Sequence, residues 1–275
     1  MISISQQAGR LGENDFSYFI SNNKDKETLV MLHAAFADHT LFEEQIAYFI
    51  DHYQLILLDL PGHGTGAAAK SRLTMKDMPD MISRILADNR IKACHLLGVS
   101  LGSLVAQAFA GRYPEQVQSV IIVGGYSIHK ANRQIRKRQQ SEGLKWIGYI
   151  LFSMTKFKQY VLNISCYTEQ GRRLFEQGIQ HFRRQSFQAM SGMSSFFTKK
   201  TDPMPSPMLL IIGEHDLAIA RQAAKELHRL EPQSQLIEIP GAGHCANADA
   251  PEAVNRVIEH YLSMITPSPS AGIRT

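Results

Sequence analysis

The chain alternates between near-continuous apolar runs and segments in which apolar residues recur at helical spacing. The apolar runs have no polar face, which is typical of strands covered on both sides in a parallel sheet. They occupy residues 28–33, 54–60, 93–99, 120–123 and 208–212. Because helical stretches separate them, they predict a doubly wound α/β sheet with right-handed crossovers.

The helical stretches and the two ends of the chain complete this pattern. Apolar residues follow a helical period over residues 41–50, 75–86, 104–112 and 218–230,. Residues 235–239 and 251–264 predict a last strand and a last helix. Residues 2–5 and 16–21 alternate apolar and polar positions, which predicts an antiparallel pair at one sheet edge,. We therefore expect an eight-stranded, mostly parallel sheet with helices on both faces.

One segment, residues 128–204, interrupts the alternation. It contains no recognisable buried strand, and its helical patches end at three prolines, Pro203, Pro205 and Pro207. We interpret it as a helical insertion after the sixth strand, within a core formed by residues 1–127 and 205–265. The polar tail, 266–275, has the composition of a disordered end,.

The insertion is strongly basic. It holds 14 Lys and Arg against 4 Asp and Glu, so it is ten charges positive, whereas the whole chain is +4. A solvated helix face is one interpretation, and attraction of an anionic substrate or surface is another. Nucleic-acid binding is disfavoured because no recognised binding motif accompanies the charge.

Cysteine usage and the amino terminus bear on the compartment. The 275 residues include only 3 cysteines, without paired or metal-ligand spacing, which favours a reducing environment and no metal site,. The first residues lack a basic start and an apolar run, and no apolar segment is long enough to cross a bilayer,. These features predict a cytoplasmic protein that does not span a membrane.

A candidate nucleophile follows the third parallel strand of the chain. Residues 98–102 read Gly-Val-Ser-Leu-Gly, a G-x-S-x-G pattern placed where a strand passes into a helix,. Such a turn strains the central residue and crowds its neighbours, so glycine is needed two positions to each side. Gly98 and Gly102 meet this requirement, and Ser100 is the predicted nucleophile.

A serine nucleophile needs a base, and the base needs an orienting acid. His244 follows the last strand, at the sheet edge where ligands of open α/β sheets gather,. Asp216 lies on a loop after the preceding strand and could reach His244. The order Ser, Asp, His is the one expected of this fold. No metal or organic cofactor is required.

Five motifs in chain order extend this interpretation. They are LVMLHAAFADH (29–39), DLPGHG (59–64), GVSLG (98–102), GEHD (213–216) and GAGHCANADAPEAVN (241–255). They resemble the strand and oxyanion loop, the D-x-P-G-H-G turn, the nucleophile elbow, the acid loop and the histidine loop of the α/β-hydrolase superfamily. The likeness covers nearly the whole chain and is greatest to capped serine esterases and carbon-carbon bond hydrolases.

The resemblance implies roles for individual residues. Ser100 would attack, His244 would accept and return the proton, and Asp216 would hold the imidazole. The backbone N–H groups of Ala35 and Leu101 would form the oxyanion hole. Ala34 and Phe36 depart from the family, whose members usually have glycine at the first position and often at the second.

The resemblance also places the insertion as a cap over Ser100. We expect Phe36, Val99, Tyr126 and Trp146 to contact a small-molecule substrate. The expected partners are that substrate alone, with the chain a monomer or a homodimer.

The predicted reaction is hydrolysis of an ester-like or activated carbonyl bond through an acyl-serine intermediate. A carbon-carbon bond hydrolase or a lyase acting on an anionic metabolite is an alternative, since the insertion is basic. Perhydrolase or cofactor-free haloperoxidase activity is a weaker one, because the same triad supports it. A ligand sensor or partner-binding protein that keeps the triad is an alternative of another class. Epoxide hydrolase and haloalkane dehalogenase chemistry is disfavoured, because those relatives carry aspartate at the position of Ser100.

Overall fold

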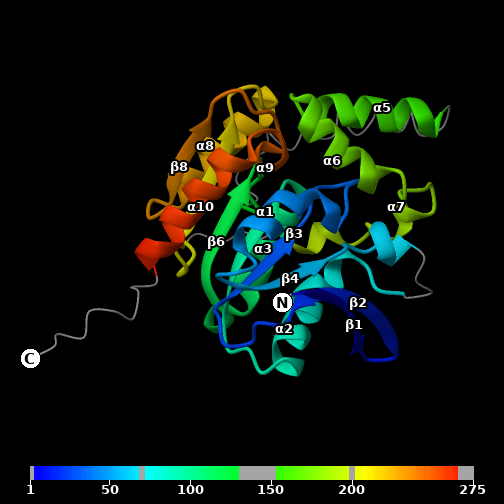
Figure 1. Cartoon of the computed structure of the whole chain (residues 1–275), viewed down its shortest axis with the longest axis vertical. Coiled ribbons are helices and arrows are strands. Elements are labelled where there is room, and N and C mark those ends of the chain that lie inside the picture. Colours follow the sequence, from blue (N-terminus) through cyan, green and yellow to red (C-terminus); the bar gives the residue numbers. More distant parts are fainter. Residues whose placement is uncertain (1–2, 68–71, 130–152, 198–201, 266–275) are drawn as a thin grey trace, which may run out of the picture.

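A computed structural model describes residues 3–67, 72–129, 153–197 and 202–265. Eight strands form one sheet in the order β1-β2-β4-β3-β5-β6-β7-β8 (Figure 1). β1 pairs antiparallel with β2, and β2 pairs antiparallel with β4, while every pairing from β4 to β8 is parallel. The strands are β1 Ile4–Leu11, β2 Asn14–Ser21, β3 Thr28–Leu32, β4 Gln54–Leu58, β5 Cys94–Val99, β6 Val117–Val123, β7 Met208–Gly213 and β8 Gln235–Ile239. The predicted eight-stranded, mostly parallel sheet is confirmed.

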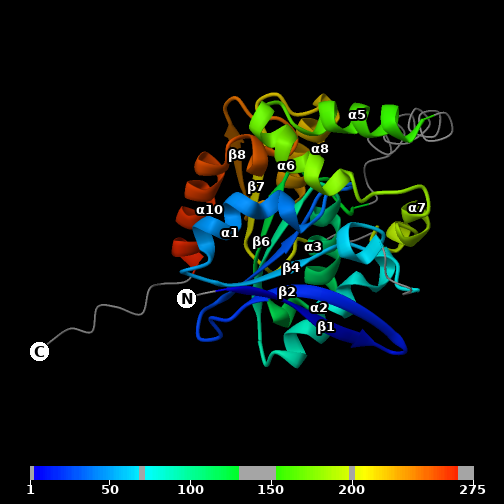
Figure 2. The same ribbon diagram turned by 45° about the vertical axis from the view of Figure 1, so that its right-hand side comes forward.

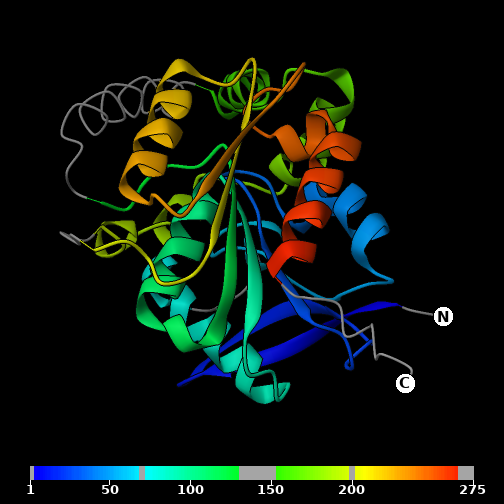
Figure 3. The same ribbon diagram turned by 90° about the vertical axis from the view of Figure 1, so that its left-hand side faces the viewer.

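Helices cover both faces of this sheet. The helices of one face, α1 and α10, lie across the sheet from α2, α3 and α8 (Figure 3). Their bounds are α1 Glu43–Phe49, α2 Met78–Asp88, α3 Leu101–Arg112, α8 Ala218–Leu230 and α10 Pro251–Ile265. Every residue of β3, β4, β5 and β7 is buried between these layers, which explains their continuous apolar sequences,.

Several predicted boundaries are wrong by two residues or more, including that of the strand predicted at 120–123, which begins at Val117. The first strand was expected at residues 2–5, but β1 spans Ile4–Leu11 and pairs along its whole length with β2. Most of its residues are exposed, so no apolar pattern marks it, and the tight turn at Gly12 (φ 60°) sets the register. The helix expected from residue 104 begins at Leu101, directly after Ser100, and Gly102 and Ser103 lie within it.

Between β6 and β7 the described residues contain no strand of the sheet, and their helices are α5 Met154–Ser165, α6 Glu169–Ile179 and α7 Ser186–Ala189. Side-chain oxygens of Ser153 and Thr168 cap the amino ends of α5 and α6,. α6 packs on the 3-10 helix η1 His39–Phe42 after β3 and on α9 Ala246–Asp249 after β8. The described helices α5 and α6 of the insertion therefore lie beyond the carboxyl ends of the parallel strands (Figure 2).

Four further 3-10 turns complete the described secondary structure: η2 Gly64–Ala67, η3 Met75–Asp77, η4 Pro114–Gln116 and η5 Met193–Ser195. None of the helices in the described ranges combines the length and the apolar composition that a membrane span requires. Trp146, the basic cluster at 130–138 and the tail at 266–275 lie outside the described residues.

Candidate active site

Ser100 occupies a strained turn between β5 and α3. Its backbone has φ 49° and ψ −108°, in the positive-φ range that a residue with a side chain rarely adopts,. A Cβ added to Gly98 would lie 2.6 Å from the Gly102 carbonyl oxygen, and one on Gly102 would lie 2.0 Å from that of Leu32. Both flanking glycines are therefore required by close backbone approach, as the sequence pattern predicted.

The three predicted side chains meet at the carboxyl edge of the sheet. Ser100 Oγ lies 2.8 Å from His244 Nε2, and His244 Nδ1 lies 2.8 Å from Asp216 Oδ1. Asp216 Oδ1 also accepts from the Leu217 N–H at 2.6 Å, which fixes the carboxylate against its own loop. This arrangement is an unbroken chain of hydrogen bonds from carboxylate through imidazole to hydroxyl.

The surroundings of His244 set its affinity for a proton. Burial of the imidazole disfavours the charged form, but the negative charge of Asp216 and the hydrogen bond to it outweigh burial and raise the pKa of His244 above its ordinary value of 6.5,. An imidazole paired in this way favours holding a proton taken from Ser100. The arrangement therefore suits a base that becomes an imidazolium during the reaction.

Sequence patterns gave no indication that Gly124 is part of the site. It follows β6 with φ 56°, and a Cβ there would lie 2.4 Å from the His244 carbonyl oxygen and 2.9 Å from His244 Nδ1. Gly124 thus provides the space into which the imidazole fits. A glycine directly after a buried strand is the only sequence signal that could have indicated this.

The two N–H groups predicted for an oxyanion hole belong to the elbow and to the loop after β3. Leu101 is the first residue of α3, and Ala35 lies on the loop after β3. Within the described part of the chain, no protein acceptor receives a hydrogen bond from either N–H. Both N–H groups thus lack a hydrogen-bond acceptor among the described residues, as an oxyanion-hole donor must before substrate binds,.

Phe36 shapes the loop that carries Ala35. Its φ of 71° lies in the left-handed region, where relatives often have glycine, so the departure noted in the sequence carries backbone strain,. Its ring is buried and contacts Phe157 and Phe182 edge-on, with centroids 5.1 and 4.9 Å away. Because those two rings belong to the insertion, Phe36 joins the Ala35 loop to the insertion through an aromatic cluster.

The other residues predicted to contact substrate are placed differently. Val99 is fully buried at the end of β5. The ring of Tyr126 lies 6.1 Å from that of His244, beside the site. Trp146 is not among the described residues, so its predicted contact remains a prediction.

Two polar residues of the family-like loops have structural partners. Buried His33 bonds the Ala34 carbonyl through Nδ1 at 2.8 Å and accepts from the Leu60 N–H through Nε2 at 2.9 Å. The Asp59 carboxylate accepts from Thr65 and from the backbone and ring of His39. Burial opposes ionisation of Asp59, but the hydrogen bond from His39 and nearby positive charge outweigh it and lower the pKa of that carboxyl. Both residues hold loops in shape.

A cavity of about 560 Å³ lies between α7 and the turn after β4. Its lining includes Pro61, Gly62, Arg72, Gln185 and Gln188, but none of Ser100, Asp216 and His244. This cavity therefore lies between the insertion and the core, and the three residues of the hydrogen-bonded series do not line it.

Comparison with known families agrees with the fold. A family model described as "alpha/beta hydrolase fold" matches residues 27–151, and one described as "TAP-like protein" matches residues 190–269. Together they include all five motifs noted in the sequence.

Individual relatives are distant in sequence but similar over most of their length. A (E)-2-((N-methylformamido)methylene)succinate hydrolase from Acinetobacter baylyi is 23% identical over 272 residues, covering 92% of this chain and 96% of the relative. A pimeloyl-[acyl-carrier protein] methyl ester esterase from Aeromonas hydrophila is 23% identical and covers 85% of this chain and 94% of its own. These relatives are hydrolases.

The solved structure of a thermophilic esterase from Thermogutta terrifontis superimposes with a TM-score of 0.77 at 19% identity, covering 96% of this chain and 99% of that one. At this identity the likeness concerns the fold. Family models, relatives and fold agree: the chain belongs to the α/β-hydrolase superfamily and is an α/β-hydrolase enzyme.

Proposed function

We propose that this enzyme is a serine hydrolase that cleaves ester-like or activated carbonyl bonds of small molecules. The observation that carries the proposal is the hydrogen-bonded series from Asp216 Oδ1 through His244 to Ser100 Oγ, each link being 2.8 Å. The strained elbow at Ser100 and the unpaired N–H groups of Ala35 and Leu101 supply the remaining parts of an acyl-transfer site,.

The first half-reaction forms an acyl-serine. Ser100 Oγ attacks the carbonyl carbon while its proton passes to His244 Nε2, and the carbonyl oxygen becomes an oxyanion facing the N–H groups of Ala35 and Leu101. The tetrahedral species collapses when the bond to the leaving alcohol breaks. His244 gives its proton to that alcohol, so Ser100 ends acylated and His244 neutral.

The second half-reaction restores the enzyme. A water molecule takes the position of the alcohol, gives a proton to His244 and attacks the acyl carbon. Collapse then releases the carboxylic acid and returns the proton to Ser100 Oγ. Asp216 stays ionised throughout and stabilises the imidazolium in both halves.

Turnover of p-nitrophenyl acetate and butyrate tests this proposal. Ser100→Ala removes the nucleophile and is expected to lower kcat by about 10⁴-fold or more, with the fold retained. Ser103→Ala is a matched control, because Ser103 lies one turn along α3 and, among the described residues, its hydroxyl donates to the Ser100 carbonyl alone. Retained activity in Ser100→Ala would overturn the proposal.

A second candidate is cleavage of an anionic metabolite, including a carbon-carbon bond hydrolysis or lyase-like step. The observation favouring it is the charge of residues 128–204, with 14 basic and 4 acidic side chains. The Acinetobacter baylyi relative, whose name specifies a substituted succinate, supports an acidic substrate.

Neutralising Arg133, Arg136 and Arg138 together distinguishes the two candidates. An anionic substrate predicts that KM rises more for carboxylated esters than for neutral ones. A control that changes Lys24, Lys26 and Lys92 to Gln removes the same charge before β3 and β5, at the amino ends of the parallel strands. An unchanged ratio of the two KM values in the arginine variant would count against the anionic candidate.

A further inference from the structure

Asp249 is a buried carboxylate that receives hydrogen bonds from two distant parts of the chain. Its Oδ2 accepts from the Gly243 N–H at 2.8 Å and from the Tyr167 N–H at 2.9 Å. Its Oδ1 accepts from the N–H and the hydroxyl of Thr168, both at 2.8 Å. One side chain, only five residues after His244, thus bonds both the histidine loop and the start of α6.

The surrounding backbone is built closely around this carboxylate. A Cβ on Gly171 in α6 would lie 2.2 Å from Asp249 Oδ1. A Cβ on Gly243 would lie 3.0 Å from both Asp249 Oδ2 and the Tyr167 nitrogen. Two glycines, one on each side of the boundary, therefore leave just enough room for the carboxylate.

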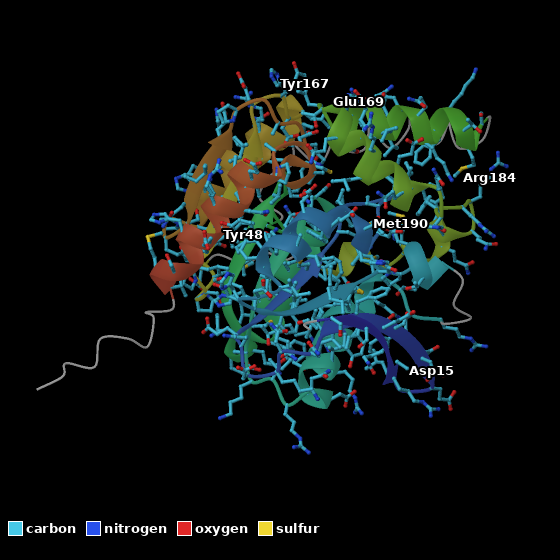
Figure 4. All side chains as sticks on the ribbon, in the orientation of Figure 1. Asp15, Tyr48, Tyr167, Glu169, Arg184 and Met190 are labelled. Carbon is cyan, nitrogen blue, oxygen red and sulfur yellow. The ribbon has the colours of Figure 1, made fainter. Side chains whose placement is uncertain are left out.

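The same corner of the insertion has further bonds to the catalytic loops. The Cys245 N–H donates to the Ser165 carbonyl at 2.8 Å. The ring of Tyr167 stacks on His215, the neighbour of Asp216, with centroids 3.9 Å apart. Figure 4 labels Tyr167 and Glu169 at this outer corner, where α5 ends and α6 begins. Residues 165–168 are thus attached to the loops that carry both His244 and Asp216.

We propose that Asp249 is a positioning residue that makes the seating of His244 depend on the insertion. It holds Gly243, the residue before His244, and the amino end of α6 on one carboxylate, so that the imidazole keeps its bond to Asp216 only while α6 is docked. This inference rests on the proposed function in assigning His244 as the base, but it concerns the geometry of the imidazole itself.

Asp249→Asn tests this role with little change in shape. The amide keeps one oxygen but turns an NH2 group toward N–H donors. Either the Gly243 N–H or the Thr168 N–H therefore loses its acceptor,. A displaced imidazole is expected to lower kcat by about 10- to 100-fold, with little change in KM. The apparent pKa in the kcat/KM profile is expected to fall toward the ordinary histidine value, because the His244 to Asp216 bond loosens.

Two further variants separate positioning from plain loss of stability. Thr168→Val removes the hydroxyl bonds to Asp249 and to the Gly171 N–H, but leaves the Gly243 bond intact. It is expected to lower Tm without moving the pH profile. Gly171→Ala favours the helix but pushes on Asp249 Oδ1 from the insertion side, and is expected to shift the profile in the same direction as Asp249→Asn,. It decides the matter if Asp249→Asn does not fold.

Proton NMR of the His244 Nδ1–H bound to Asp216 gives a readout that does not depend on turnover. The downfield resonance is expected in the wild type and in Thr168→Val, and is expected to be lost or broadened in Asp249→Asn and Gly171→Ala. A wild type that neither hydrolyses esters nor reacts with a fluorophosphonate contradicts the proposed function, while the resonance still decides the role of Asp249. The inference would be overturned if Asp249→Asn and Gly171→Ala both left the resonance and the pH profile unchanged. It would also be overturned if Thr168→Val shifted the pH profile as much as Asp249→Asn does when the two variants have the same Tm.

Discussion

Ser100, His244 and Asp216 are each delivered by the end of a different parallel strand, β5, β8 and β7. The sequence was sufficient to predict their meeting, because parallel strands end at one edge and each residue follows a predicted strand within a short motif. Gly124 and Asp249 could not be predicted in this way. Their roles depend on a backbone approach and on hydrogen bonds across about 80 residues of chain, which leave no local pattern.

The raised pKa of His244 predicts the pH dependence of activity. The base must be neutral to accept the Ser100 proton, so kcat/KM is expected to fall as pH drops through a value above 6.5,. Asp216→Asn removes the charge that raises the pKa of His244, so the inflection is expected to move to lower pH and kcat to fall by about 10⁴-fold. An inflection that stays in place in Asp216→Asn would contradict the assigned cause.

The same shift has a consequence for stability. A histidine whose pKa is higher in the folded state than its unfolded value stabilises the fold fully below that unfolded value, and loses this contribution as pH rises through the folded pKa,. Urea unfolding should compare Ser100→Ala with the double variant Ser100→Ala, Asp216→Asn. The difference in unfolding free energy between these two proteins should be larger at low pH than at high pH. A difference that grows with pH would refute the assignment.

At the scale of elements, the apolar runs predicted the buried strands well, because burial on both faces requires them to be apolar throughout. β1 was predicted poorly, because its residues are mostly exposed and its pairing with β2 is set by the turn at Gly12. The insertion was recognised because its sequence contains no recognisable buried strand. How its helices attach to the core depends on individual buried side chains that composition cannot reveal.

Glu231, the residue after α8, holds both crossings between core and insertion. Its carboxylate accepts from His129 Nε2 at 3.0 Å, where the chain leaves the core, and from the Met204 N–H at 2.6 Å, where it returns. Because Glu231 is fully buried, Glu231→Gln is expected to lower the free energy of unfolding by about 3 kcal/mol in urea titrations,. Glu226→Gln, which loses a surface pair with Arg229 on the same helix, should cost less than about 1 kcal/mol,. An equal loss of unfolding free energy in the two variants would contradict the role of Glu231 in holding the two crossings.

At the scale of the whole molecule, three buried carboxylates of the core receive the insertion. Asp38, near the Ala35 loop, bonds His181 at 3.1 Å, Asp249 bonds the start of α6, and Glu231 bonds the two crossings. Two of these carboxylates also lie beside proposed catalytic loops. The described part of the insertion is therefore hydrogen-bonded to the core beside the proposed site, which is the contact on which the proposed role of Asp249 depends.

Fold similarity alone does not specify this chemistry, since one fold supports many reactions. The central claim is that Ser100 is an activated nucleophile, and covalent labelling tests it most directly. Incubation with a fluorophosphonate followed by peptide mass spectrometry is expected to place one phosphonyl group on Ser100, with no adduct in Ser100→Ala and slower labelling in His244→Ala. An unlabelled Ser100 in the folded wild type, or equal labelling of Ser100→Ala, would contradict the account.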